Sequence, residues 1–176
     1  MIIFFTWNVN HNVDAMKLAC EHLARVGSCV AAFQEAPGVD AAMIAGWTGA
    51  SLALLDATSS DTAKVLFVAS PDLSIDPMGA RHRLEPTLDV NCRLEGLTLL
   101  SGAGKPFQIL GVHGLDRVNH RTSEERQVAG QLLRRVIESF WSGGPLVVLG
   151  DLQSNPFDRE ITHRTGLRGR LRGWCR

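Results

Sequence analysis

The spacing of apolar residues predicts a strand, a helix and a second strand at the start of the chain. Residues 2–7 form an apolar run, which is typical of a strand buried on both faces of a sheet. A helix is expected next, because Asn12 or Asp14 can cap its start and Gly27 can end it. The apolar face of this helix would carry Val13, Met16, Cys20 and Leu23. Residues 29–33 are the second apolar run and predict the second strand.

The middle of the chain predicts a series of short strands. Pro37 and Gly38 break the chain, and a short helix is expected over residues 39–45. Residues 88–94 alternate apolar and polar positions, as a strand with one solvent-facing side does. Polar or glycine-rich turns separate the predicted strands, which are residues 51–55, 64–69, 88–94, 97–100 and 107–112.

The last third begins with a helix and a strand. Thr122 and Glu125 form a capping box ahead of a helix with one apolar stripe. Residues 145–149 are the last clear strand, and Asn155 can cap another helix behind it. This mixture of strands and helices favours an α/β (α+β) fold in which two packed sheets are flanked by helices.

Size, charge and cysteine usage narrow the class of protein. The 176 residues are 45% hydrophobic and 20% charged, which suits one globular domain. The net charge is +0, so no overall positive field attracts nucleic acid. The four cysteines have no metal-binding spacing and indicate no disulfide framework, so a cytoplasmic protein is expected. No apolar run approaches the roughly 18 residues of a membrane span.

Four polar residues stand where predicted strands end. They are Asn8, Glu35, His113 and Asp151. Ligands often bind at the carboxyl ends of strands, where loops converge. Each residue also has a simpler interpretation: a surface carboxylate for Glu35, a turn or cap for Asp151, a structural histidine for His113 and an asparagine turn for Asn8.

Together these side chains suit cleavage of a phosphate ester. Mg²⁺ prefers oxygen ligands and is often held by one or two carboxylates, for which Glu35 and Asp151 are the candidates. His113 can donate a hydrogen bond to phosphate or act as an acid or base. Asn8 and Asn10 offer amides to a phosphate oxygen or a metal-bound water. Arg83 can clamp phosphate or belong to a solvated loop.

The sequence resembles the endonuclease/exonuclease/phosphatase superfamily, which includes the DNase I-like metal-dependent phosphohydrolases. The resemblance covers residues 1–166, and the remaining residues 167–176 are an arginine-rich tail. It rests on Trp7-Asn8-Val9-Asn10, Gln34-Glu35, Val112-His113 and Gly150-Asp151-Leu152-Gln153-Ser154-Asn155-Pro156-Phe157-Asp158.

The resemblance implies a four-layer α/β/β/α sandwich of two packed mixed sheets, with the site at one end. By position, Glu35 matches the metal-binding glutamate and His113 the histidine that contacts the scissile phosphate. Asp151 matches the aspartate that positions the attacking water, and Asn8 matches the family asparagine. Asn10 falls where some members have a metal-linked aspartate.

Two departures from the family pattern are evident. Gln153 stands where the motif usually has asparagine, and its amide, on a longer side chain, can still reach a phosphate with altered geometry. Asn155 either compensates or caps the following helix. No Asp-His pair follows Asp151, although the family closes with one. The last strand or strands are therefore expected to be lacking, which would leave a strand edge free to pair with another chain. A fragment of a longer enzyme is a further interpretation.

The leading hypothesis is a hydrolase that cleaves phosphodiester or phosphomonoester bonds with Mg²⁺, such as a nuclease or phosphatase. Mn²⁺ prefers the same oxygen ligands and is an alternative metal. The substrate can be nucleic acid, a phospholipid headgroup or an inositol phosphate. The alternative hypothesis is a non-catalytic family member that acts as a binding or interaction protein.

Overall fold

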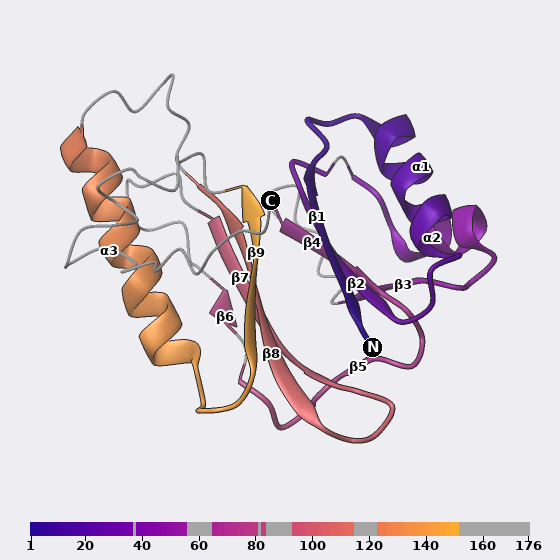
Figure 1. Cartoon of the computed structure of the whole chain (residues 1–176). Coiled ribbons are helices and arrows are strands. Elements are labelled where there is room, and N and C mark those ends of the chain that lie inside the picture. The colour runs from indigo at the N-terminus through magenta and orange to yellow at the C-terminus, as the bar shows by residue number, and fades with distance from the viewer. Residues whose placement is uncertain (37, 56–64, 81, 84–92, 115–122, 152–176) are drawn as a thin grey trace, which may run out of the picture.

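A computed structural model describes residues 1–36, 38–55, 65–80, 82–83, 93–114 and 123–151 (Figure 1). Its strands form two sheets. The first sheet has the order β1-β2-β4-β3, with β1 parallel to β2 and the other pairs antiparallel. These strands are β1 (Ile3–Asn8), β2 (Cys29–Gln34), β3 (Ala53–Leu55) and β4 (Val65–Ala69).

The second sheet has the order β5-β7-β8-β9, and β6 also pairs with β7. Only β8 and β9 are parallel to each other among its described pairs. The strands are β5 (Ser74–Ile75), β6 (His82–Arg83), β7 (Arg93–Leu100), β8 (Pro106–His113) and β9 (Leu146–Asp151). Both sheets therefore mix parallel and antiparallel strands, as expected.

Three apolar cores separate four layers. The helices α1 (Val13–Leu23) and α2 (Ala41–Thr48) cover the outer face of the first sheet, where Met16, Ile44 and Phe33 are fully buried. A second core lies between the sheets. The helix α3 (Ser123–Phe140) covers the outer face of the second sheet (Figure 1). The order helix, sheet, sheet, helix confirms the predicted α/β/β/α sandwich.

Gly111 lets the two sheets approach closely near the end of β8. A Cβ atom at this position would lie 2.4 Å from Val65 Cγ1 and 2.7 Å from Phe67 Cζ, both on β4 of the other sheet. Any larger residue would therefore push the sheets apart. Two residues later β8 ends at His113, so the same close approach brings this histidine toward the first sheet.

One prediction about the first strand is wrong. The apolar run at residues 2–7 was expected to be buried on both faces, but among the described strands β1 is the edge of its sheet. Phe4 is 37% exposed and Trp7 is 41% exposed. Edge strands share the apolar composition of central strands, because one or both faces can still contact a core, so the run alone did not distinguish them.

Other local predictions are confirmed with small shifts. Asn12 caps α1, since its Oδ1 accepts the N–H of Ala15 at 3.0 Å. The helix ends at Leu23, before the predicted Gly27, and α2 begins two residues later than expected. The predicted strand at 97–100 is part of the longer β7. The helix predicted behind Asn155 and the tail 167–176 lie outside the described residues.

The described cysteines agree with the sequence interpretation. Cys20 and Cys29 are free and buried in the core beneath α1. Burial raises the pKa of the Cys20 thiol to about 12, with the nearby Cys29 thiol contributing. These thiols therefore serve as small hydrophobic groups. Among the described helices, none is long and apolar enough to cross a membrane.

Candidate active site

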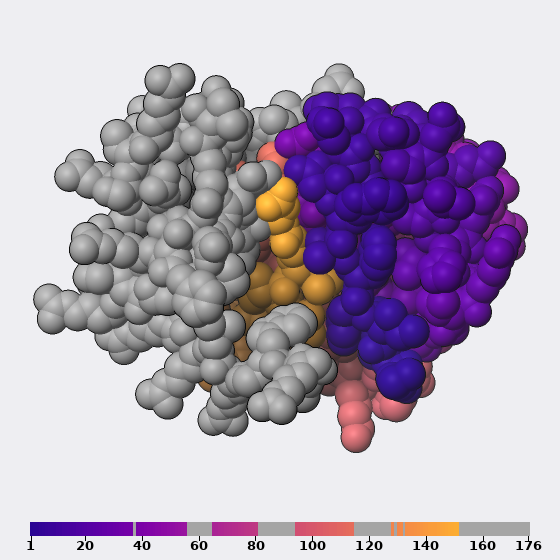
Figure 2. Space-filling model, turned by 45° about the horizontal axis from the view of Figure 1, so that its top comes forward, coloured from indigo at the N-terminus to yellow at the C-terminus, as the bar shows by residue number. Residues whose placement is uncertain are grey.

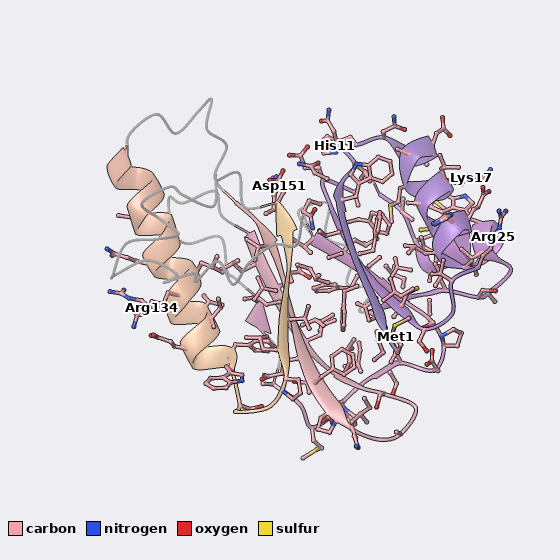
Figure 3. The ribbon with its side chains drawn as sticks, in the orientation of Figure 1. Met1, His11, Lys17, Arg25, Arg134 and Asp151 are labelled. Atoms are coloured by element: carbon pink, nitrogen blue, oxygen red, sulfur yellow. The ribbon has the colours of Figure 1, made fainter. Side chains whose placement is uncertain are left out.

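The four residues singled out at strand ends come together at one end of the sandwich. Asn8 is the last residue of β1, and Glu35 directly follows β2 beside it in the first sheet. His113 and Asp151 are the last residues of β8 and β9 and stand opposite each other in the second sheet. Figure 3 shows Asp151 at this end, at the carboxyl tip of β9. Two hydrogen bonds then join the two sheets.

The first of these bonds joins Glu35 to His113. Nε2 of His113 lies 3.0 Å from Oε1 of Glu35, and both side chains are largely shielded from solvent. With Nε2 as donor, the neutral ring carries its free lone pair on Nδ1. Nδ1 is buried and has no hydrogen-bond partner within the described part of the chain. The glutamate therefore fixes the orientation of the imidazole.

The second bond joins Asn8 to Asp151. Nδ2 of Asn8 donates to Oδ2 of Asp151 at 3.3 Å, across 143 positions of sequence. Oδ1 of Asn8 accepts the backbone N–H of Asn10 at 3.0 Å. Both ends of the Asn8 amide are thus engaged, so its orientation relative to Asp151 is defined. Asn10 contributes its backbone to this arrangement.

The backbone beside Glu35 is left-handed at three residues. Glu35 has φ +50°, Asn10 has φ +45° and His11 has φ +58°. The two turns are joined, because the N–H of His11 donates to the carbonyl of Glu35 at 2.9 Å. A non-glycine residue in this region costs roughly 1–2 kcal/mol, and such residues cluster at functional sites. Glu35 is therefore held in position at a conformational cost.

Gly150 allows Asp151 to reach its place beside His113. Its φ is +151°, and a Cβ atom here would lie 1.9 Å from the carbonyl oxygen of Val112 on the neighbouring strand. The close neighbour of Gly150 is therefore the backbone of β8. The carbonyl of Asp151 then accepts the N–H of Gly114 at 2.7 Å.

Gln34 supports the site from beneath and was given no role from sequence. Its side chain is fully buried, and Nε2 donates to Thr6 Oγ1 and to the carbonyl of Ala32, both at 3.1 Å. Its own carbonyl accepts the N–H of Val9 at 3.0 Å. The available signal in the sequence was an amide residue at the end of an apolar run, directly before the candidate glutamate. Such a residue is expected to be buried, and a buried polar group needs hydrogen-bond partners.

The donor atoms at this end suit a hard cation in chemical type. Two carboxylates and one amide are oxygen donors of the kind that Mg²⁺ binds together with several waters. Among the described residues, however, no group of three or more histidine, cysteine, aspartate or glutamate side chains is arranged to hold a metal ion. Within the described part of the chain, Glu35 and Asp151 are therefore the candidate carboxylate ligands.

The structure describes only part of the remaining site residues that were predicted from the sequence. Arg83 lies in β6, where its backbone pairs with Glu95 of β7, and its side chain lies outside the described atoms. Gln153 and Asn155 lie outside the described residues altogether. Their predicted contacts with phosphate stay predictions.

Solved structures share this architecture. TDP2 from D. rerio, complexed with single strand DNA product, is 16% identical, with a TM-score of 0.63 over 94% of this chain and 64% of that chain. An endonuclease/exonuclease/phosphatase family protein from Bacteroides thetaiotaomicron is 10% identical, with a TM-score of 0.62 over 93% and 65%. The chain has the DNase I-like fold of the endonuclease/exonuclease/phosphatase superfamily. The fold implied by the sequence motifs is thereby confirmed.

A third neighbour with the endonuclease/exonuclease/phosphatase fold carries an anion. The human Nocturnin catalytic domain with bound sulfate is 15% identical, with a TM-score of 0.60 over 90% of this chain and 68% of that chain. This chain spans about two-thirds of the length of these neighbours. No protein-family model matches the sequence, and no curated protein sequence matches it either.

Proposed function

We propose that this protein hydrolyses phosphate esters at the end of the sandwich where Asn8, Glu35, His113 and Asp151 meet. The observation that carries the proposal is the pair of bonds across the sheets, Glu35 with His113 and Asn8 with Asp151. Two carboxylates, a histidine and an amide from four strands form a set able to bind a phosphate and direct a water. The shared fold supports this chemistry.

Each side chain has a defined task in this proposal. Glu35 would hold a divalent cation, with Asp151 as a second oxygen ligand. Bound Mg²⁺ or Mn²⁺ would supply neutralisation of the phosphate charge. His113 donates from Nε2, which is the atom that now faces Glu35, to a phosphate oxygen. Asp151 orients the attacking water, and Asn8 keeps the carboxylate of Asp151 in place.

The chemical group that the site would recognise is better defined than the molecule that carries it. The proposed site recognises the phosphate group, which nucleic acid, phospholipid headgroups and inositol phosphates share. Single-stranded DNA is the first substrate to examine, because the D. rerio TDP2 neighbour is complexed with single strand DNA product. The human Nocturnin neighbour binds a sulfate anion, which has the size and charge of a phosphate group.

A non-catalytic binding role is the second candidate, and one observation favours it. Glu35 and Asp151 already accept hydrogen bonds from His113 and Asn8. No larger acidic or histidine cluster surrounds them within the described residues. A site of this kind can bind an anion or a partner without turnover. The two candidates differ in whether the protein consumes a phosphodiester when a divalent cation is supplied.

The test measures hydrolysis of a chromogenic phosphodiester and of single-stranded DNA, with Mg²⁺, with Mn²⁺ and with chelator. The expected result is cation-dependent turnover that falls at least about a hundredfold in Glu35→Gln and in Asp151→Asn. Glu21→Gln is the matched control, because it removes the same charge on α1, where Oε1 of Glu21 lies 3.9 Å from Nζ of Lys17. Turnover that survives both site variants contradicts the proposal, and Mn²⁺ binding without turnover favours the binding role.

A further inference from the structure

The outer edges of β1 and β9 lie side by side on one flank of the sandwich. β1 ends the first sheet and β9 ends the second sheet in the described strand order. The two strands contact each other, and Asn8 at the end of one binds Asp151 at the end of the other. Figure 2 shows β9 at the surface directly beside the N-terminal segment. The flank therefore presents two strand edges together.

Hydrogen-bond alternation identifies the backbone groups that face outward from β1. The N–H groups of Ile3 and Val9 donate toward β2, to Ser28 and Gln34. Alternate residues of a strand direct their N–H and C=O groups to opposite sides. The groups of Phe4 and Thr6 therefore point away from β2. Within the described ranges no strand pairs with this edge.

The alternation of hydrogen bonds also identifies the backbone groups that face outward from β9. The carbonyls of Pro145 and Asp151 accept N–H groups from β8 and its following residue, so these odd-numbered positions face β8. The backbone groups of Leu146 and Val148 consequently point outward. Val148, at the centre of the strand, is also 41% exposed. The described strands leave this edge unpaired as well.

Neither edge carries the features that usually prevent pairing. Proteins protect free edges with charged residues, proline or bulges. β1 contains no charged residue and no proline, and β9 is uncharged until Asp151 at its end. Phe4 and Trp7 add exposed apolar area on β1, at 37% and 41% exposure. The net charge of +0 gives no overall repulsion between copies of the chain.

We propose that this flank pairs with the same flank of a second copy of the chain. A two-fold axis perpendicular to the stacked sheets sets each strand antiparallel to its own copy. One such axis can serve both edges, because β1 and β9 lie on the same side of the sandwich. Both sheets then continue from one copy into the other. The strands meet beside Asn8 and Asp151, so the second copy adjoins the candidate site.

The experiment measures the molecular mass and the backbone hydrogen-exchange rates of the protein over a range of protein concentrations. Light scattering from about 1 µM to about 1 mM covers the affinities expected for a small interface. We expect a rise from the mass of one chain to that of two. Hydrogen exchange at β1 and β9 should slow at least about tenfold over the same range, while α1 exchanges unchanged. The exchange result locates the contact at the edges.

Two substitutions at one exposed position provide the matched comparison. Val148→Lys adds a positive charge at the centre of the β9 edge in each copy and should weaken association at least about tenfold. Val148→Thr keeps a β-branched, uncharged residue and should associate like the wild type. A single-chain mass at every concentration overturns the proposal. Edge amides already slow in the dilute single chain, or a dimer indifferent to Val148→Lys, also overturn it.

Discussion

Nε2 of His113 and Oε1 of Glu35 lie 3.0 Å apart and join the two sheets at the end where their strands finish. The histidine belongs to β8 of the second sheet, and the glutamate follows β2 of the first. The close approach of the sheets at Gly111 makes this contact possible. The relative position of the two residues is therefore a property of the whole sandwich.

The first prediction separates two roles of His113. Because Nε2 is the donating atom, glutamine can place an amide N–H in a similar position. His113→Gln should keep hydrolysis within about tenfold of wild type, whereas His113→Ala should lose about a hundredfold to a thousandfold in kcat. The measurement is steady-state hydrolysis of a chromogenic phosphodiester. Equal losses in both variants would instead indicate that the imidazole transfers a proton, since glutamine cannot do so.

The second prediction concerns Gly150. A Cβ atom there would lie 1.9 Å from the carbonyl oxygen of Val112, and the φ of +151° is unfavourable for other residues. Gly150→Ala should therefore lower the free energy of unfolding by at least about 3 kcal/mol, as severe overpacking does. Gly144→Ala is the control, because nothing lies within 4 Å of a Cβ at that position. Urea denaturation of the two variants makes the comparison, and a similar loss in both would contradict the strand contact.

The residues of the site were easier to predict than their pairing. Asn8, Glu35, His113 and Asp151 could each be identified because a polar residue ends an apolar strand. Which side chain faces which depends on the contact between the sheets, and no local pattern encodes that contact. Residues 8 and 151, for example, are 143 positions apart. The functions of Gly150 and Gln34 depend in the same way on neighbours from other strands.

Sheet edges and very short strands also could not be predicted from the sequence. The apolar run of β1 gave no sign that β1 ends the order of the described strands, because composition records burial on faces and not hydrogen bonding at edges. β5 and β6 have two residues each, too few for any alternation to be visible. Their pairing with β7 is imposed by the longer strand.

The third prediction uses Asp72, which lies away from the candidate site. Hydrogen bonds from the hydroxyl groups of Ser28 and Ser70 lower the pKa of its carboxyl below the ordinary 3.8. A lowered folded pKa stabilises the native state above the unfolded value, and this stabilisation disappears as pH falls through the folded pKa. Wild type should thus exceed Asp72→Asn in stability at pH 6, with the difference vanishing as pH falls below the folded pKa of Asp72. Because Asp72 is exposed, the effect should be small, and Asp76→Asn serves as the comparison.

The last prediction places a second carboxylate against Asp151. Nδ2 of Asn8 now donates to Oδ2 of Asp151 at 3.3 Å, so Asn8→Asp replaces a hydrogen bond with two like charges in contact. One of the two carboxyl groups must then have a raised pKa. A raised folded pKa destabilises the native state as pH rises from the unfolded value near 4 through the folded pKa. The variant should lose about 1–3 kcal/mol of unfolding free energy at pH 7 and much less at pH 4.

Asn8→Ala distinguishes charge repulsion from simple loss of the bond. It removes the same donor without adding charge, so its loss of stability should not depend on pH between 4 and 7 in the way that the Asn8→Asp loss does. Thermal or urea denaturation at the two pH values measures both variants. If Mg²⁺ binds between Glu35 and Asp151, it should also restore stability to Asn8→Asp at pH 7, because a divalent cation offsets two adjacent negative charges. A pH-independent loss in Asn8→Asp would mean that Asn8 and Asp151 are not in contact in solution.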